Sequence, residues 1–189
     1  MSKIIVSGAS GLVGSVLLPL LESGEHEVAR LVRGHSDIGG RDMWSRRDLV
    51  FWDPVEGELD AAAFEGAEAV VHLAGENIAA GRWNNARKKR IRESRVDGTK
   101  LLCAKLAEMP SPPRVIVCAS AIGFYGDRGN ETLTEDSPAG EGFLPDVCRE
   151  WRRRAPPPWG RVSGSSDCAS ESFSARREEP SGRCWARLN

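Results

Sequence analysis

Short apolar segments alternate with longer segments of helical periodicity over the first 119 residues of the chain. The apolar segments predict five strands, at residues 4–7, 27–33, 49–52, 69–73 and 115–119. Helices are predicted over residues 12–23, with Gly24 just past the end, and over residues 84–108. Continuously apolar strands separated by helices are typical of a parallel sheet that is covered on both faces. We therefore expect an α/β fold with a doubly wound, Rossmann-like parallel sheet.

The first predicted strand runs directly into a glycine-rich turn with the spacing GxxGxxG. Gly8 permits the tight turn, Gly11 lets the backbone approach a phosphate, and Gly14 lets the helix pack closely on the strand. An ordinary glycine-rich turn is the alternative, but the position between a strand and a helix favours a dinucleotide pyrophosphate site. The candidate cofactor-binding residues of this turn are Gly8, Ala9, Ser10, Gly11, Leu12, Val13 and Gly14.

The residue that ends the second predicted strand indicates which dinucleotide is bound. An acidic residue at this position accepts hydrogen bonds from the ribose hydroxyls of NAD, whereas this chain has Arg33. A guanidinium pairs with a 2′-phosphate through two hydrogen bonds, which favours NADP over NAD. The alternative for Arg33 is a solvated surface residue. Asp53, after the third strand, is a candidate contact for the adenine amino group, and a turn-initiating Asp-Pro pair is the alternative.

The composition changes after Trp151. Residues 152–189 hold eight Arg, no Lys and seven Ser, and show neither a strand nor a helix period. Their few apolar side chains cannot offset an ordering entropy of about 1–2 kcal/mol per residue. The segment is either a native tail or, as we favour, an out-of-frame translation of GC-rich DNA. We expect a Rossmann domain at residues 1–151, C-terminally truncated and without a sixth strand, followed by an irregular or disordered tail at residues 152–189.

Charge and composition narrow the classes of partner. A formal net charge of −1 gives no reason to expect nucleic acid or a membrane as a partner, and no apolar run reaches the roughly 20 residues of a transmembrane helix. The N-terminus lacks the regions of a signal peptide, and the five cysteines show no CxxC pair, so we expect reduced thiols and a cytoplasmic protein. The three histidines are scattered, and no metal site is predicted.

Three further segments resemble a known family. They are HLAGENI at residues 72–78, RWNNARKKRIRESRVDGTKLL at residues 82–102 and SAIGFYG at residues 120–126. With the glycine turn, they resemble the extended short-chain dehydrogenase/reductases, also called the NAD(P)-dependent epimerase/dehydratase superfamily, and within it an atypical epimerase-like subfamily. The resemblance covers residues 1–151 and implies a Rossmann fold. It implies an NADP(H) site with contacts from residues 8–14 and from Arg33, Leu73, Ala74, Gly75, Glu76, Ala119 and Ser120.

The chain differs from active members of this family at the residues that would carry out catalysis. Active members use a Tyr-x-x-x-Lys pair to move a proton, whereas Tyr125 is followed four residues later by Gly129. The helix that should hold this pair is expected to begin at Cys148, with Arg152 at the place of the lysine. Ser120 and Tyr125 are therefore the catalytic candidates, with a strand-end hydrogen bond and a packed ring as their alternative roles.

Two functions remain open from the sequence. The first is an NADP(H)-binding oxidoreductase or epimerase-like protein that acts on an unknown carbonyl or sugar-like small molecule. The second is a non-catalytic, redox-sensing nucleotide-binding protein or an inactive truncated product. The oligomeric state is not predicted.

Overall fold

The computed structural model describes residues 1–34, 48–154 and 184–188 of the 189-residue chain. The strands are β1 (Lys3–Ser7), β2 (Glu27–Arg33), β3 (Leu49–Asp53), β4 (Glu58–Leu59), β5 (Ala67–His72), β6 (Val115–Ala119) and β7 (Cys184–Leu188). The α-helices are α1 (Leu12–Ser23), α2 (Asn85–Ala107) and α3 (Phe143–Arg154), and the short 3₁₀ helices are η2 (Ala61–Phe64) and η3 (Ile122–Phe124).

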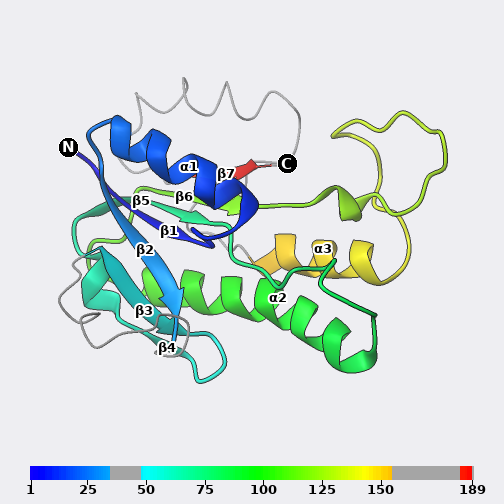
Figure 1. The fold of residues 1–189 in the computed structure, drawn as a ribbon, viewed down its shortest axis with the longest axis horizontal. Coiled ribbons are helices and arrows are strands. Elements are labelled where there is room, and N and C mark those ends of the chain that lie inside the picture. The colour runs from blue at the N-terminus through cyan, green and yellow to red at the C-terminus, as the bar shows by residue number, and fades with distance from the viewer. Residues whose placement is uncertain (35–47, 155–183, 189) are drawn as a thin grey trace.

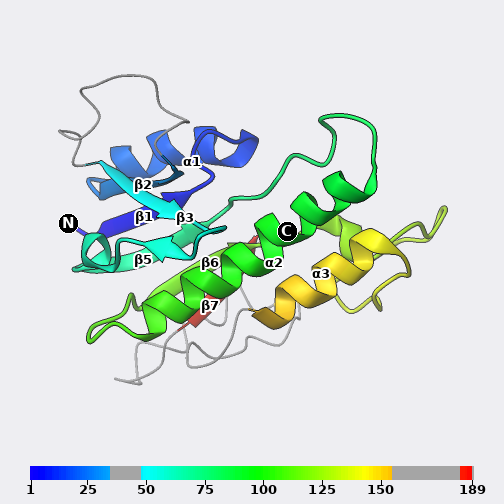
Figure 2. The ribbon, with the colours of Figure 1, turned by 90° about the horizontal axis from the view of Figure 1, so that it is seen from below.

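The strands form one sheet in the order β4-β3-β2-β1-β5-β6-β7. Every pairing is parallel except that of β3 with the two-residue β4. Without β4 this is the 3-2-1-4-5-6 order of the Rossmann fold, which confirms the expected class. The strand order reverses between β1 and β5, where Ser7 pairs with His72 at the carboxyl ends. In Figures 1 and 2, α1 covers one face of the sheet while α2 and α3 lie on the other.

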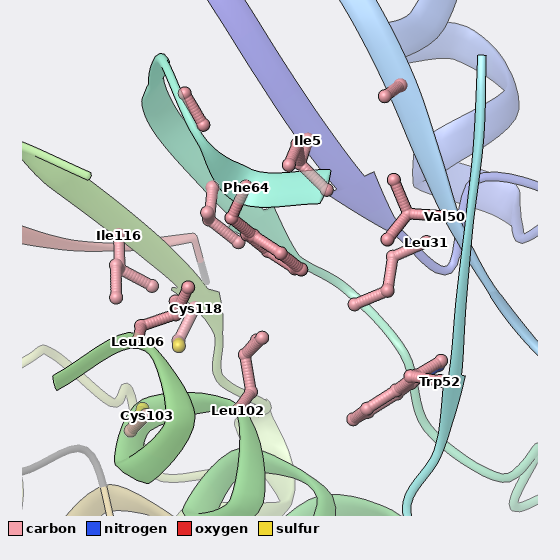
Figure 3. Packing of buried hydrophobic residues seen from close by; sticks show 13 residues of the cluster. Ile5, Leu31, Val50, Trp52, Phe64, Leu102, Cys103, Leu106, Ile116 and Cys118 are labelled. Carbon is pink, nitrogen blue, oxygen red and sulfur yellow. The ribbon is translucent and has the colours of Figure 1, made fainter. Parts of the chain in front are cut away.

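Each face of the sheet has its own apolar core, because successive strand residues point to opposite sides. On the α2 face, Ile5 packs with Phe64, Leu102 and Ile116, as Figure 3 shows. On the α1 face, the neighbours of Ile5 along the strand join a smaller cluster around Leu18. Burial of each large side chain contributes about 1.5–3 kcal/mol relative to exposure. Burial on both faces explains why the strands read as continuous apolar runs.

Two features of the C-terminal part differ from the sequence expectations. Helix α3 begins at Phe143, five residues before the expected start at Cys148, and its buried Val147 and Trp151 lie on one face at i, i+4 spacing. Residues 152–154, assigned to the irregular tail, continue this helix. Residues 184–188 form β7 beside β6, where no strand was expected; main-chain pairing with a sheet edge does not require a side-chain period. The rest of the expected tail, residues 155–183 and 189, lies outside the described residues.

Helix α3 is fixed to α2 by a buried hydrogen bond. Trp151 Nε1 donates to Thr99 Oγ1 at 2.8 Å, and both residues are buried. The guanidinium of Arg95 lies over the Trp151 ring at 5.7 Å from its centroid, and Arg92 pairs with Glu150 at the helix surface. These contacts set the position of α3 against the sheet.

A buried polar pair joins the central strands at their carboxyl ends. The Ser7 hydroxyl and His72 Nδ1 lie 2.7 Å apart, and both residues are fully buried. The His72 ring also meets the Trp52 ring edge-on, with centroids 5.7 Å apart. Burial lowers the pKa of His72 from 6.5 to about 4, so the imidazole is neutral in the folded protein near pH 7.

We predict that Thr99→Val destabilises the protein by about 1–3 kcal/mol. The substitution keeps the shape of the side chain but leaves the buried indole N–H of Trp151 without its acceptor. Urea unfolding measures the change. The same substitution at the exposed Thr132 should change the free energy of unfolding by less than about 0.5 kcal/mol. Equal effects at the two positions would contradict this role for Thr99.

We also predict a pH dependence of stability that originates in His72. Because the folded-state pKa lies below the unfolded value, stability is complete above pH 6.5 and is lost as the pH falls towards 4. Lowering the pH from 7 to 5 should cost about 2 kcal/mol through this one group. His72→Gln should show a correspondingly smaller loss in urea unfolding at the two pH values. An identical loss in both proteins would refute the prediction.

Candidate functional site

A cavity of about 480 Å³ opens at the carboxyl edge of the central strands, a size typical of a small-molecule site. The β1–α1 turn, the end of β2 and the segment after β5 form its walls. The predicted cofactor residues that line it are Gly8, Ala9, Ser10, Gly11, Arg33, Leu73, Ala74 and Gly75. The predicted residues Leu12, Val13, Gly14, Asp53, Glu76 and Ala119 are not among its lining residues. The cavity therefore brings together three segments that are distant in the sequence.

The glycine turn allows helix α1 to rest directly on the end of β1. Gly8 has a φ of 69°, and a Cβ at this position would lie 2.7 Å from the carbonyl carbon of Leu73. A Cβ on Gly14, inside the helix, would lie 2.3 Å from the Gly8 carbonyl oxygen. Gly11 is the N-cap of α1 and offers no side-chain cap to the first N–H groups of the helix. The helix N-terminus is thus left to satisfy its N–H groups with an anion or with solvent.

Ser7 attaches the segment after β5 to the glycine turn. Its hydroxyl oxygen accepts hydrogen bonds from the backbone N–H groups of Leu73 and Ala74, at 3.2 and 3.3 Å. The sequence analysis did not single out Ser7, although a serine directly before Gly8 in an apolar strand was a visible signal. The two hydrogen bonds fix the distance between the glycine turn and the segment after β5, which are two walls of the cavity.

Helix α2 holds the same segment from the other side. Ser94 Oγ accepts from the Glu76 N–H at 2.9 Å, and Arg95 Nη1 donates to the Glu76 carbonyl oxygen at 3.0 Å. The Arg95 guanidinium packs so closely on Gly75 that a Cβ there would lie 3.1 Å from its Cζ. Glu76 therefore shapes the segment through its backbone, and Ser94 is a lining residue that the sequence analysis missed.

Arg33 is exposed at the end of β2 and lines the cavity, as does Arg30. Arg30 Nη2 lies 3.5 Å from Glu22 Oε1, so its charge is partly balanced on the protein surface. Asp53 Oδ1 accepts hydrogen bonds from the N–H groups of Val55 and Glu56 and thereby forms a turn. A turn-initiating Asp-Pro pair was the alternative to an adenine contact at this residue. The neighbouring Trp52, which the sequence analysis did not assign to the site, lines the cavity instead.

The two catalytic candidates lie beyond the end of β6 and do not line the cavity. Ser120 Oγ accepts two hydrogen bonds from Arg152, from Nε at 3.2 Å and from Nη2 at 3.1 Å. The Arg152 guanidinium lies 3.7 Å from the centroid of the Phe124 ring. Tyr125 follows η3 and packs its ring edge-on against Phe124, with centroids 5.3 Å apart. The structure thus connects Ser120 to Arg152, a partner that spacing in the sequence did not reveal.

Cys148 is a buried thiol next to these residues. Burial raises its pKa above the usual range, and the guanidiniums of Arg152 and Arg95 oppose only part of that rise. The thiol therefore stays protonated near neutral pH and is a poor nucleophile. Cys148 therefore acts as a small packing residue.

Two other features are absent from the part of the chain that the structure describes. No group of three or more His, Cys, Asp or Glu side chains there could hold a metal ion. None of the helices described is long and apolar enough to cross a membrane.

Known proteins resemble this chain over most of its length. The sequence profile of the NAD dependent epimerase/dehydratase family matches residues 4–143. The chain is 34% identical over 154 residues to the epimerase family protein Mb2239 of Mycobacterium bovis, with 82% of this chain and 48% of the relative covered. It is 31% identical over 156 residues to human SDR39U1, with 81% and 48% covered. The chain thus spans about half the length of the curated relatives it matches.

Solved structures also superpose on most of this chain. A nucleoside-diphosphate sugar epimerase of Corynebacterium glutamicum superposes with a TM-score of 0.61 at 40% identity, covering 82% of this chain and 30% of that one. Human SDR39U1 (isoform 2), crystallised with NADPH, superposes with a TM-score of 0.64 at 28% identity, covering 87% and 50%. The glycine turn, the strand order and the profile match agree with one another, and the chain belongs to the NAD dependent epimerase/dehydratase family.

Proposed function

We propose that this chain binds NADP(H) in the cavity at the end of β1. The observation that carries the proposal is that the glycine turn and Arg33 line the same cavity. The turn brings the N-terminus of α1, without a side-chain cap, to one wall, where a pyrophosphate would satisfy the first N–H groups. Arg33 stands at the end of β2, where it would pair with a 2′-phosphate. Human SDR39U1 with NADPH is a relative in which this cofactor is bound.

We further propose that the whole protein is an oxidoreductase or epimerase-like enzyme acting on a small carbonyl or sugar-like molecule. A nicotinamide cofactor, when bound, supplies or accepts the hydride. Ser120 and Tyr125 are the candidates of this chain for holding or moving the proton. Ser120 fits the role better, because β6 pairs with β5 in parallel and Ser120 follows β6 at the edge where Leu73 and Ala74 follow β5.

A non-catalytic nucleotide-binding protein is the second candidate. It is favoured by the position of Ser120 and Tyr125 outside the lining of the cavity and by Gly129 at the place of a catalytic lysine. Turnover of NADPH with any carbonyl compound, abolished by Ser120→Ala, would exclude this candidate. NADPH binding without turnover over a broad carbonyl panel would support it.

The proposed setting of the protein is the cytoplasm, with a small-molecule substrate and neither nucleic acid nor a membrane as partner. Cys103 and Cys148 are buried thiols that form no disulfide, as is usual for proteins of a reducing compartment. Burial also raises the pKa of the Cys103 thiol to about 12. Cell fractionation tests the location.

We predict that Gly14→Ala abolishes binding of both nucleotides. Alanine normally stabilises a helix interior by about 1 kcal/mol over glycine, but here its Cβ would meet the Gly8 carbonyl oxygen at 2.3 Å and displace the turn. Isothermal titration with NADPH and NADH measures the effect. Ser15→Ala, at the next and exposed position of the helix, is the matched control and should bind as the wild type does. Wild-type affinity in Gly14→Ala would place the nucleotide elsewhere.

We predict that Arg33→Gln weakens NADPH binding by about 10- to 100-fold while NADH binding changes little. The substitution removes a charge-assisted pair with the 2′-phosphate, and NADH has no such phosphate. Titration of both nucleotides measures the ratio. Arg114→Gln, which removes an exposed arginine just before β6 at the amino edge of the sheet, controls for net charge. An equal loss for the two nucleotides would contradict the assignment of Arg33 as the selecting residue.

A further inference from the structure

The hydroxyl oxygen of Ser120 accepts two hydrogen bonds from a single guanidinium. Nε and Nη2 of Arg152 both donate to Ser120 Oγ, at 3.2 and 3.1 Å, across 32 residues of sequence. The Cζ atom of this planar group lies over the Phe124 ring, 3.7 Å from its centroid, and this contact restricts the orientation of the guanidinium. Over the described ranges 1–34 and 48–154, no carboxylate lies within ion-pair distance of Arg152. The positive charge of Arg152 therefore lies beside Ser120, the Phe124 ring and the Cys148 thiol.

This arrangement determines what the Ser120 hydroxyl can do. A serine hydroxyl has one O–H donor and two lone pairs, and Arg152 takes both lone pairs. The O–H group is then the hydrogen-bonding capacity that remains, and repulsion from the two donated N–H hydrogens favours its pointing away from the guanidinium. Because arginine stays charged at any physiological pH, its field permanently favours the deprotonated form of its partner. A serine hydroxyl held in this way would be a hydrogen-bond donor of increased acidity.

The elements around the pair hold it at the functional edge of the sheet. Ser120 follows β6, which pairs in parallel with β5, and Leu73–Gly75 after β5 line the nucleotide cavity. Arg152 lies in the last turn of α3, one residue after Trp151, whose indole is anchored on Thr99 of α2. Both partners are half-buried, so the pair is shielded but still reachable. The nearby Cys148 thiol does not share this property, because burial raises its pKa.

We propose that Arg152 is a positioning residue that makes Ser120 the proton donor to the carbonyl oxygen of the substrate. The inference rests on the proposed function and identifies the substrate class as a carbonyl compound whose oxygen accepts a hydrogen bond from Ser120. The carbonyl carbon gains a hydride from the reduced nicotinamide cofactor, which is oxidised, and the π electrons of the C=O bond move to oxygen. That oxygen takes the proton of Ser120, and Arg152 stabilises the Ser120 alkoxide until water returns a proton.

The test replaces the hydroxyl by a group whose acidity can be measured without a substrate or a cofactor. In Ser120→Cys the pKa of the thiol is obtained from the pH dependence of iodoacetamide labelling, with the modified site identified by mass spectrometry. An ordinary thiol has a pKa of about 8.5, and a neighbouring cation lowers it. We expect a pKa of about 7.5 or below, which raises the thiolate fraction at pH 7 by about eightfold or more.

Paired variants isolate the contribution of Arg152. In Ser120→Cys/Arg152→Gln the thiol pKa should return to about 8.5 or above, and Ser120→Cys/Arg152→Lys should retain part of the decrease because it keeps the charge. Ser120→Cys/Arg153→Gln removes an exposed arginine of the same turn and should behave as Ser120→Cys does. A thiol pKa that is unchanged by loss of Arg152, or that is ordinary while Arg152 is present, would overturn the proposal.

The Ser120→Cys/Arg152→Lys variant also serves if the Arg152→Gln variant does not fold. A lysine that keeps the charge but fails to lower the thiol pKa would contradict the proposal equally. Titration with NADPH separates this inference from the proposed function. Wild-type protein that does not bind NADPH would refute the proposed function. An Arg152-independent thiol pKa in a protein that binds NADPH would refute the role of Arg152 alone.

Discussion

The contact between Gly14 and the carbonyl oxygen of Gly8 is the constraint on which the functional half of this fold depends. There is no room for a side chain at this crossing, since a Cβ on Gly14 would lie 2.3 Å from that oxygen. The closeness places α1 directly over the end of β1 and leaves the helix N-terminus without a side-chain cap. Ser7, one residue before the turn, then fixes the segment after β5 through two backbone N–H groups. A pocket for an anion follows from backbone geometry, with very few side chains involved.

The opposite face of the sheet is organised by side chains. Helix α2 holds the backbone of Glu76 through Ser94 and Arg95, and it also anchors Trp151 of α3 through Thr99. One helix therefore positions both the wall of the cavity and the helix that carries Arg152. The cavity wall and the Ser120–Arg152 pair share this support, although their residues come from different parts of the chain. A disturbance of the α2–α3 contact is expected to reach both.

The chain departs from the chemistry that its family resemblance implies, and the departures fit together. Tyr125 is packed against Phe124 and is followed four residues later by Gly129, so the Tyr-x-x-x-Lys pair is absent at this position. The cationic group in this region is Arg152, and it acts on a serine. A guanidinium keeps its charge and offers two donors in one plane, which suits a fixed polarising role better than proton exchange. In our proposal, the Ser120–Arg152 pair takes over the acid–base role that the family assigns to Tyr-x-x-x-Lys.

The sequence by itself determined the parallel sheet, the glycine turn and the place of Arg33, because these depend on signals within a few residues. Apolar runs located β2 and β6 to the residue, and Gly24 marked the end of α1. It could not determine contacts between distant segments, since these depend on the strand order and on how the helices pack. The role of Ser7 between two loops, the turn made by Asp53, and the pairing of Arg152 with Ser120 across 32 residues belong to this class. The start of α3 and the position of β7 were likewise decided by the surfaces they pack or pair against, because burial against α2 and the open edge of β6 outweigh the weak local signals of these segments.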